Sequence, residues 1–234
     1  MFAMSTLLWA DAPQDQARGN DASESWVIEP DESLPNVLIL GDSISIGYTL
    51  EVRKQLAGKA NVFRPAIGTV ERSKPFNCQG TTNGIKKVDR WLAGRKWDVI
   101  HFNFGLHDLK HVDQETGGNS SLETDPQQAK PALYEKQLGE IVEKLAATKA
   151  HLIFATTTPI APNTTKPLRK PEYPIEYNRV ALEVLKPYNV EINDLHALCE
   201  PVLLSIQKPR NCHFKEEGYK MLATQVAKKI AEAL

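Results

Sequence analysis

A short apolar run that ends in a turn, residues 36–45 (NVLILGDSIS), constrains the fold more than any other stretch of the sequence. Four consecutive apolar residues, Val37–Leu40, predict a strand that is buried on both faces. The residues that follow the turn, 44–57, fit a helix. Ligands bind at the carboxyl ends of the strands in an open parallel sheet, and a helix that starts there points unpaired N–H groups at the same place. The sequence therefore predicts that Ser43 stands at a ligand-binding edge.

Apolar segments that fit strands alternate with helical patterns along the rest of the chain. The further strands are predicted at residues 61–64, 97–104, 151–156 and 190–193, and the further helices at residues 84–92, 134–147, 175–185, 195–206 and 216–233. This alternation predicts the α/β class, a three-layer α/β/α sandwich around a five-stranded parallel sheet. We expect the flavodoxin-like strand order 2-1-3-4-5, which has its switch point beside strand one and so beside Ser43. Polar segments at 65–83, 109–129 and 162–174 predict loops.

Length and charge narrow the classes of protein that fit. The 234 residues, 41% hydrophobic, fit one domain over 35–234 that follows a polar lead-in at 1–34. The formal net charge of -1 and the lack of a dense basic run argue against a nucleic-acid partner. No apolar run approaches the roughly 20 residues of a membrane span.

The first twelve residues end in an Ala-x-Ala pattern, which leaves two interpretations open. One is the end of an export signal whose start lies upstream, with a periplasmic or extracellular protein. The other is a frayed terminus of a cytoplasmic protein.

A serine acts as a nucleophile only when a base lies within hydrogen-bond reach and donors await the oxyanion. The chain has six histidines. His213 is the best candidate base for Ser43, because it lies in a loop immediately before the last predicted helix.

Four short motifs support this pairing because they occur in order at the expected strand edges. They are Gly41-Asp42-Ser43, Gly80 in NCQGTTNG, Gly105-Leu106-His107-Asp108 and Asn211-Cys212-His213. Together they resemble the four blocks of the SGNH branch of the GDSL lipase and esterase superfamily, and the resemblance runs from Asn36 to the carboxyl terminus. It implies acyl transfer without a metal or cofactor, in which Ser43 attacks an ester carbonyl and His213 moves the proton. It also implies an oxyanion hole formed by the backbone N–H groups of Ser43 and Gly80 and the side chain of His107.

Two positions depart from the family pattern. His107 stands where the family has Asn, and a neutral imidazole can still donate one N–H. Asn211 stands where the family has its acid, so it cannot be an anionic partner of His213. Replacing the triad Asp by Asn in a serine protease costs about 10⁴ in turnover because the histidine tautomer is wrong. Three outcomes stay open: a backbone carbonyl orients His213, another acid such as Asp194 reaches it, or activity is weakened or lost.

The three cysteines are too few for a disulfide framework. Cys78 lies two residues before Gly80, and Cys212 lies next to His213. If both loops converge on Ser43, a disulfide between Cys78 and Cys212 is one hypothesis for an exported protein. The other is that each is a small buried apolar residue.

Three classes of function remain after these observations. The leading hypothesis is a serine esterase that removes small acyl groups, most plausibly acetyl, from a carbohydrate. The resemblance supplies that substrate class, and the polar loops suit a hydrophilic ligand. A lipase or lysophospholipase that acts on longer chains is the alternative enzyme. A carbohydrate-binding relic is the non-enzymatic alternative, and a flavodoxin-type cofactor protein is a distant third, because GDSIS lacks the glycines and hydroxyls that cradle a phosphate.

Overall fold

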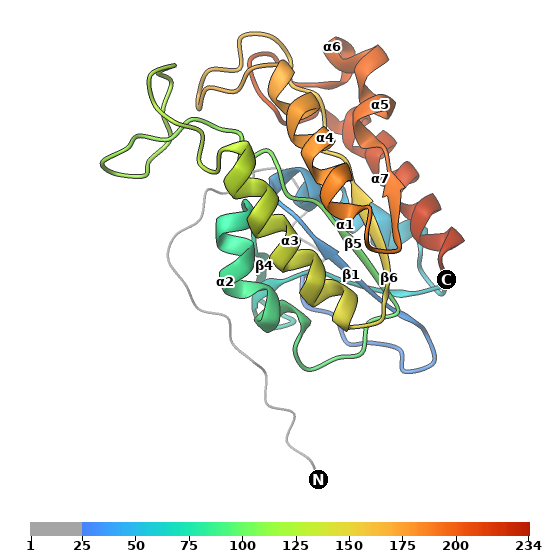
Figure 1. Cartoon of the computed structure of the whole chain (residues 1–234). Coiled ribbons are helices and arrows are strands. Elements are labelled where there is room, and N and C mark those ends of the chain that lie inside the picture. Colours follow the sequence, from blue (N-terminus) through green and yellow to red (C-terminus); the bar gives the residue numbers. More distant parts are fainter. Residues whose placement is uncertain (1–24) are drawn as a thin grey trace.

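The structure, a computed structural model, describes residues 25–234, so the possible export signal lies outside the described residues. Its centre is a parallel sheet of five strands, which lies behind α2 (Thr81–Leu92), α3 (Pro131–Ala147) and α4 (Glu172–Leu185) in Figure 1. The strands are β1 (Asn36–Leu40), β2 (Asn61–Phe63), β5 (Val99–Phe102), β6 (His151–Ala155) and β7 (Val190–Asn193). Their order, β2-β1-β5-β6-β7, is 2-1-3-4-5 in chain order, and every pairing is parallel. The predicted strand order is therefore confirmed.

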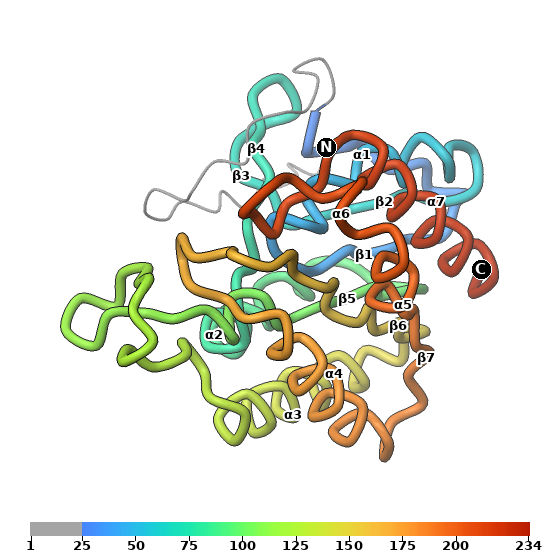
Figure 2. Tube along the Cα trace, turned by 90° about the horizontal axis from the view of Figure 1, so that it is seen from above, coloured from blue at the N-terminus to red at the C-terminus, as the bar shows by residue number. Residues whose placement is uncertain are grey.

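Helices cover both faces of this sheet. They are α1 (Ser43–Gln55), α2 (Thr81–Leu92), α3 (Pro131–Ala147), α4 (Glu172–Leu185), α5 (Leu195–Cys199), the 3₁₀ turn η1 (Glu200–Val202), α6 (Leu203–Ile206) and α7 (Glu216–Glu232). α1 packs against α7 on one face, and α2, α3 and α4 pack side by side on the other (Figures 1 and 2). This arrangement confirms the predicted three-layer sandwich.

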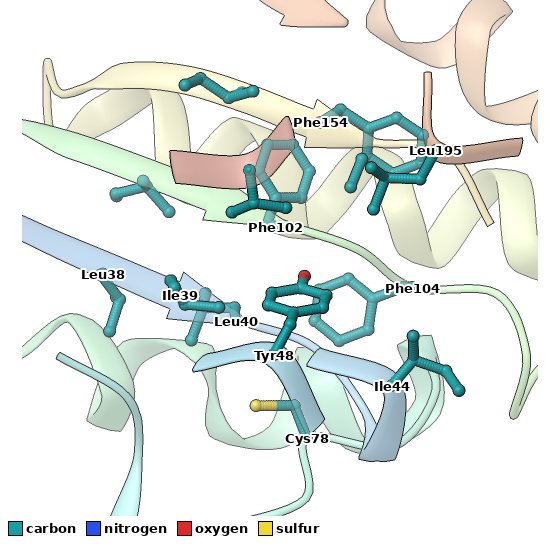
Figure 3. Packing of buried hydrophobic residues seen from close by; sticks show 14 of the residues in the cluster. Leu38, Ile39, Leu40, Ile44, Tyr48, Cys78, Phe102, Phe104, Phe154 and Leu195 are labelled. Atoms are coloured by element: carbon teal, nitrogen blue, oxygen red, sulfur yellow. The ribbon is translucent and has the colours of Figure 1, made fainter. Parts of the chain in front are cut away.

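The core lies between β1 and the helices on either side of it. Val37–Leu40 are all buried, as are all four residues of β5, which pairs with β1. Figure 3 shows Tyr48 of α1 beside Leu40 of β1 and Phe104, with Phe102 and Phe154 packed edge to face nearby. The centroids of those two phenyl rings lie 5.4 Å apart. Because burying a side chain of this size stabilises the fold by about 1.5–3 kcal/mol, the central strands anchor the edge from which Ser43 projects.

Two predicted segments differ from the structure. The predicted loop at 65–83 contains a short antiparallel hairpin, β3 (Ala66–Gly68) and β4 (Ser73–Pro75), whose partly exposed residues give no apolar pattern. The predicted helix at 195–206 is split into α5, η1 and α6. Pro201 lies at the start of η1, and its missing N–H cannot continue an α-helical hydrogen-bond ladder.

The last part of the predicted lead-in contacts the fold. The backbone N–H of Trp26 donates to Ser73 Oγ over 2.7 Å, and Arg53 Nη1 donates to the Ser25 carbonyl over 2.7 Å. Asn61 accepts a hydrogen bond from the backbone of Asp31 at 2.9 Å. Residues 25–34 thus pack along β4, α1 and β2.

Candidate active site

Ser43 is the first residue of α1, directly after the turn that ends β1. The turn is capped by Asp42, whose Oδ1 accepts a hydrogen bond from the backbone N–H of Ile44 at 2.9 Å. Burial raises the pKa of the Asp42 carboxyl, and the Ile44 N–H and the charges of His213, Arg169 and Arg64 act against that rise. Within the described residues, the Ser43 backbone N–H donates to no acceptor. It is therefore free to donate to a ligand.

Arg64, a buried residue that no sequence motif marks, stabilises this turn through hydrogen bonds. Arg64 follows β2, and its Nη2 donates to the carbonyl of Gly41 over 2.7 Å. Its Nη1 donates to Ser45 Oγ over 2.8 Å. No signal in the sequence marks Arg64, because its role depends on β2 lying beside β1.

The structure brings Ser43 and His213 together although they are far apart in the sequence. Ser43 Oγ lies 2.8 Å from His213 Nε2. On the other side of the ring, His213 Nδ1 lies 2.6 Å from Asn211 Oδ1. The same Oδ1 accepts the backbone N–H of His213 at 2.9 Å.

The double contact of Asn211 Oδ1 decides which tautomer His213 adopts. A backbone N–H can only donate, so the Asn211 atom that faces it is the amide oxygen rather than the amide nitrogen. Because that oxygen can only accept from the ring, Nδ1 carries the proton and Nε2 is left with its lone pair toward Ser43. This is the tautomer that a general base for Ser43 needs.

Cys212 contacts the same histidine. Its Sγ lies 3.9 Å from His213 Nδ1, and this contact raises the pKa of the imidazole above its ordinary 6.5, against the opposing effect of burial. Burial alone would raise the pKa of the Cys212 thiol, but Arg169 and His213 together bring it below its ordinary value. Asn211 Oδ1 is the closer partner of Nδ1, so we assign the ring orientation to Asn211.

Gly80 caps the start of α2 and lies against a buried carboxylate. Asp108 Oδ1 accepts from both the backbone N–H and the hydroxyl of Thr81, at 2.7 and 2.6 Å. A Cβ on Gly80 would lie 2.7 Å from the same oxygen. Burial raises the pKa of Asp108 to about 7. Within the described residues, the Gly80 backbone N–H has no acceptor, so it is available to a ligand as well.

His107 lies between Leu106 and the buried Asp108 and is half-buried. Burial, followed by the charges of Lys110, Arg169 and His213, holds its pKa well below 6.5. The ring is therefore neutral at pH 7 and can donate one N–H. No described residue hydrogen-bonds to that ring, so its donor is not engaged by the protein.

The structure answers three of the open sequence hypotheses. Asp194 does not serve His213, because its Oδ1 accepts from Thr156 Oγ1 and from the backbone N–H of Ala197, at 2.8 and 3.0 Å. No backbone carbonyl takes the place of an acid either, since the Asn211 side chain occupies Nδ1. The disulfide hypothesis is wrong: Cys78 and Cys212 are both free thiols, and burial raises the pKa of Cys78 to about 11.

Gln207 is a further residue that the sequence reasoning missed. It is buried, and its Oε1 accepts from the Ala161 backbone N–H at 2.7 Å. Its Nε2 donates to the carbonyls of Pro159 and Cys212, at 3.0 and 3.1 Å. Gln207 thus ties the loop after β6 to the loop of His213. A glutamine in a polar loop gives no local signal for this role.

The described residues do not meet the requirements of a metal site with three or more such ligands or of a membrane-spanning helix. In residues 25–234, no group of three or more His, Cys, Asp or Glu side chains could hold a metal ion. Across the same range, every helix is too short or too polar to cross a membrane.

Solved structures share the fold over most of the chain. A lipase/acylhydrolase from Enterococcus faecalis aligns with a TM-score of 0.65 at 20% identity, covering 85% of this chain and 96% of that one. The acetylxylan esterase Axe2 from Geobacillus stearothermophilus aligns with a TM-score of 0.64 at 18% identity, covering 84% and 94%. An acetyl xylan esterase aligns with a TM-score of 0.63 at 14% identity, covering 83% and 99%.

Comparison at the level of sequence agrees with the fold. No curated protein matches the chain. Residues 39–221, which include Ser43, Gly80, His107 and His213, match the GDSL-like lipase/acylhydrolase family. With the strand order of an SGNH hydrolase and a serine at the edge of its first strand, the chain belongs to the GDSL-like lipase/acylhydrolase family.

Proposed function

We propose that this protein is a serine esterase that hydrolyses short acyl esters, acetyl esters above all, on a carbohydrate. The observation that carries the proposal is the line of contacts from Ser43 Oγ to His213 Nε2 and from Nδ1 to Asn211 Oδ1, at 2.8 and 2.6 Å. It gives the serine a base of the right tautomer without a triad acid.

The first half of the reaction forms an ester on the enzyme. Ser43 Oγ attacks the carbonyl carbon of the substrate while its proton moves to His213 Nε2. The carbonyl oxygen becomes an oxyanion that accepts from the N–H groups of Ser43 and Gly80 and from the neutral ring of His107. When the tetrahedral intermediate collapses, His213 returns the proton to the leaving alcohol, and the acyl group stays on Ser43.

The second half frees the serine. Water attacks the acyl-enzyme while His213 Nε2 takes one of its protons, and the oxyanion forms in the same place. Collapse releases the carboxylic acid, and Ser43 Oγ recovers its proton from His213. Asn211 Oδ1 keeps the Nδ1 proton in place throughout, and the imidazolium that forms is stabilised by a dipole rather than by a full negative charge.

The carbohydrate part of the proposal is supported by the names of similar structures and by the polarity of two segments. Two of the similar structures carry the names of acetyl xylan esterases. The segments 109–129 and 162–174 are polar, which suits a hydrophilic ligand better than an acyl chain. The name of the Enterococcus protein, a lipase/acylhydrolase, favours longer acyl chains as the second candidate.

A fluorophosphonate probe tests the nucleophile. We expect the wild-type protein to be labelled once per chain and Ser43→Ala to remain unlabelled, with p-nitrophenyl acetate hydrolysis lost in parallel. If neither labelling nor hydrolysis occurs in the wild type, the protein is a binding relic and the esterase proposal fails.

A comparison of acyl lengths tests the substrate. We expect kcat/KM to be higher for p-nitrophenyl acetate than for p-nitrophenyl octanoate. A clear preference for octanoate would replace the acetyl esterase with a lipase-type enzyme. Release of acetate from acetylated xylo-oligosaccharides, followed by NMR, tests the carbohydrate part.

A further inference from the structure

Arg169, a buried cation whose charge acts on His107 and His213, forms no salt bridge in the described residues. Arg169 is only 7% exposed, and it lies in the segment between β6 and α4. Its Nε donates to the carbonyl of Leu106 over 2.9 Å, directly before His107. The guanidinium therefore lies at the carboxyl end of β5, next to the edge that carries Ser43.

Several hydrogen bonds hold the segment of Arg169 against the loop of His213. The Arg169 backbone N–H donates to the Thr164 carbonyl over 2.9 Å, and Thr164 Oγ1 donates to the Ala161 carbonyl over 2.8 Å. The Ala161 N–H then reaches Gln207, which also bonds to the carbonyl of Cys212. Figure 2 looks down on this edge, where the segment after β6 runs beside the chain that precedes α7.

No carboxylate in the described residues forms a salt bridge with Arg169, although its charge acts on the buried Asp42 carboxyl and on the Cys212 thiol. Asp42 Oδ1 accepts from the backbone N–H of Ile44 instead, and Asp42 Oδ2 is enclosed without a partner. Among the described residues, the one hydrogen bond of the Arg169 side chain is from Nε, and its two terminal nitrogens are not sealed from solvent. A desolvated charge without a hydrogen-bonded counter-ion is costly, and a guanidinium fork matches a carboxylate in two parallel hydrogen bonds.

The field of Arg169 acts on the same groups that the proposed reaction uses. Its charge lowers the pKa of His107 and acts against the raised pKa of His213. A substrate carboxylate placed on Arg169 would neutralise this charge when the substrate binds. It would also leave His213 a better base while the reaction proceeds.

We propose that Arg169 binds a carboxylate on the alcohol part of the substrate, so that the natural substrate is an acylated saccharide with an acidic sugar, such as a uronic acid. This inference rests on the proposed esterase function. An acetyl group carries no ionisable group, so the carboxylate that binds Arg169 must belong to the sugar. Arg169 thus selects an acidic saccharide over a neutral one.

Hydrolysis of two matched esters tests the proposal. The substrates are 3-acetoxybenzoate and its methyl ester, which differ in one negative charge, and each rate is divided by that for alkaline hydrolysis. We expect the wild type to prefer the carboxylate about tenfold or more in kcat/KM, mainly through KM. Arg169→Gln should bring the ratio close to one, and Arg169→Lys, which keeps the charge without the fork, should give an intermediate ratio.

Lys170→Gln is the matched control, because it removes a positive charge from the next residue. Lys170 is paired with Glu123 at 3.0 Å on the surface, so this variant should keep the wild-type ratio. An unchanged ratio in Arg169→Gln, or an equal loss of the preference in Lys170→Gln, would overturn the proposal.

A binding measurement separates this proposal from the esterase function. Glucuronate and glucose are titrated into the wild type and into Arg169→Gln, and binding is followed by NMR. We expect glucuronate to bind the wild type and to bind the variant about tenfold more weakly, with little binding of glucose. The carboxylate site is refuted if both proteins bind glucuronate equally, or if neither protein binds it. This result does not depend on hydrolysis of either ester or on labelling by a fluorophosphonate, so it is distinct from a failure of the esterase proposal.

Discussion

The turn that carries Ser43 and the loop that carries His213 are held in place by different kinds of contact. The turn is part of the core: β1 is buried, Asp42 caps α1, and Arg64 donates to the carbonyl of Gly41 from beneath. Gln207 ties the His213 loop to its neighbour, but the orientation of the imidazole is set locally: Asn211 is exposed and holds His213 through one amide oxygen. The nucleophile is thus positioned by the fold, and the base is oriented by a neighbour two residues away.

This difference predicts how each half responds to mutation. Damage to the Ser43 side should cost stability together with activity, because the contacts that position the serine also hold β1, β2 and α1 together. Damage to the His213 side should change the rate or its pH dependence while the fold stays intact. The four variants below test this division, in order of decreasing effect.

Arg64→Leu should give the largest effect. It leaves the carbonyls of Gly41, Asp42 and Phe76 without their buried donor. A buried acceptor that loses its partner costs about 1–3 kcal/mol, so we expect unfolding free energy to fall by about 3 kcal/mol or more, with ester hydrolysis lost. Urea denaturation measures the change. Arg72→Leu, at an exposed position, should stay within about 0.5 kcal/mol of the wild type. A stable but inactive Arg64→Leu would mean that the turn does not depend on the core.

Gly80→Ala should reduce turnover strongly with less effect on the fold. The new Cβ would lie 2.7 Å from Asp108 Oδ1, so the Asp108 carboxyl or the start of α2 must shift; because Asp108 is bonded to Thr81, we expect the Gly80 N–H to be displaced in either case. Loss of one oxyanion donor costs about 10²–10³ in kcat, and we expect about 100-fold for p-nitrophenyl acetate. Gly139→Ala is the control, since its Cβ would find its nearest neighbour at an ordinary 4.0 Å. Wild-type turnover in Gly80→Ala would exclude Gly80 from the oxyanion hole.

Asn211→Asp tests how the side chain of residue 211 orients and stabilises His213. In a serine protease the Asp→Asn change costs about 10⁴ because the tautomer is wrong, but here Oδ1 already holds the proton on Nδ1. An aspartate would add only the attraction between its charge and the imidazolium. We therefore expect turnover to rise by about tenfold, equivalent to 1.4 kcal/mol, with unchanged thermal stability. Asn211→Leu, which removes the acceptor, should lower turnover; equal rates in Asn211→Asp and wild type would mean that another group already supplies the charge.

These halves also differ in how much of them the sequence predicts. The strand, turn and helix around Ser43 are predictable from the sequence, because a short run of consecutive apolar residues is typical of a strand buried on both faces. The other four strands are predictable from similar apolar runs. The role of Asn211 is not predictable from the sequence, because it depends on whether the oxygen or the nitrogen of its side-chain amide faces the backbone N–H of His213. Arg64 and Arg169 are also missed, since each acts on residues that are close only in the folded chain. Family resemblance located the motifs, and only the structure shows how the departure at Asn211 is accommodated.

Cys212→Ser should produce the smallest effect, a change in pH dependence alone. Catalysis needs neutral His213, so activity is lost as pH falls through the pKa of the imidazole. Cys212 raises that pKa above 6.5, which places the acid limb of the kcat/KM profile above pH 6.5. A serine hydroxyl does not ionise, so the variant should have a lower His213 pKa and an acid limb displaced toward lower pH. At pH 6 it should therefore retain a larger share of its own maximal rate than the wild type. If the limb does not move, the thiol at 3.9 Å does not influence the pKa of the imidazole and is only a packing neighbour.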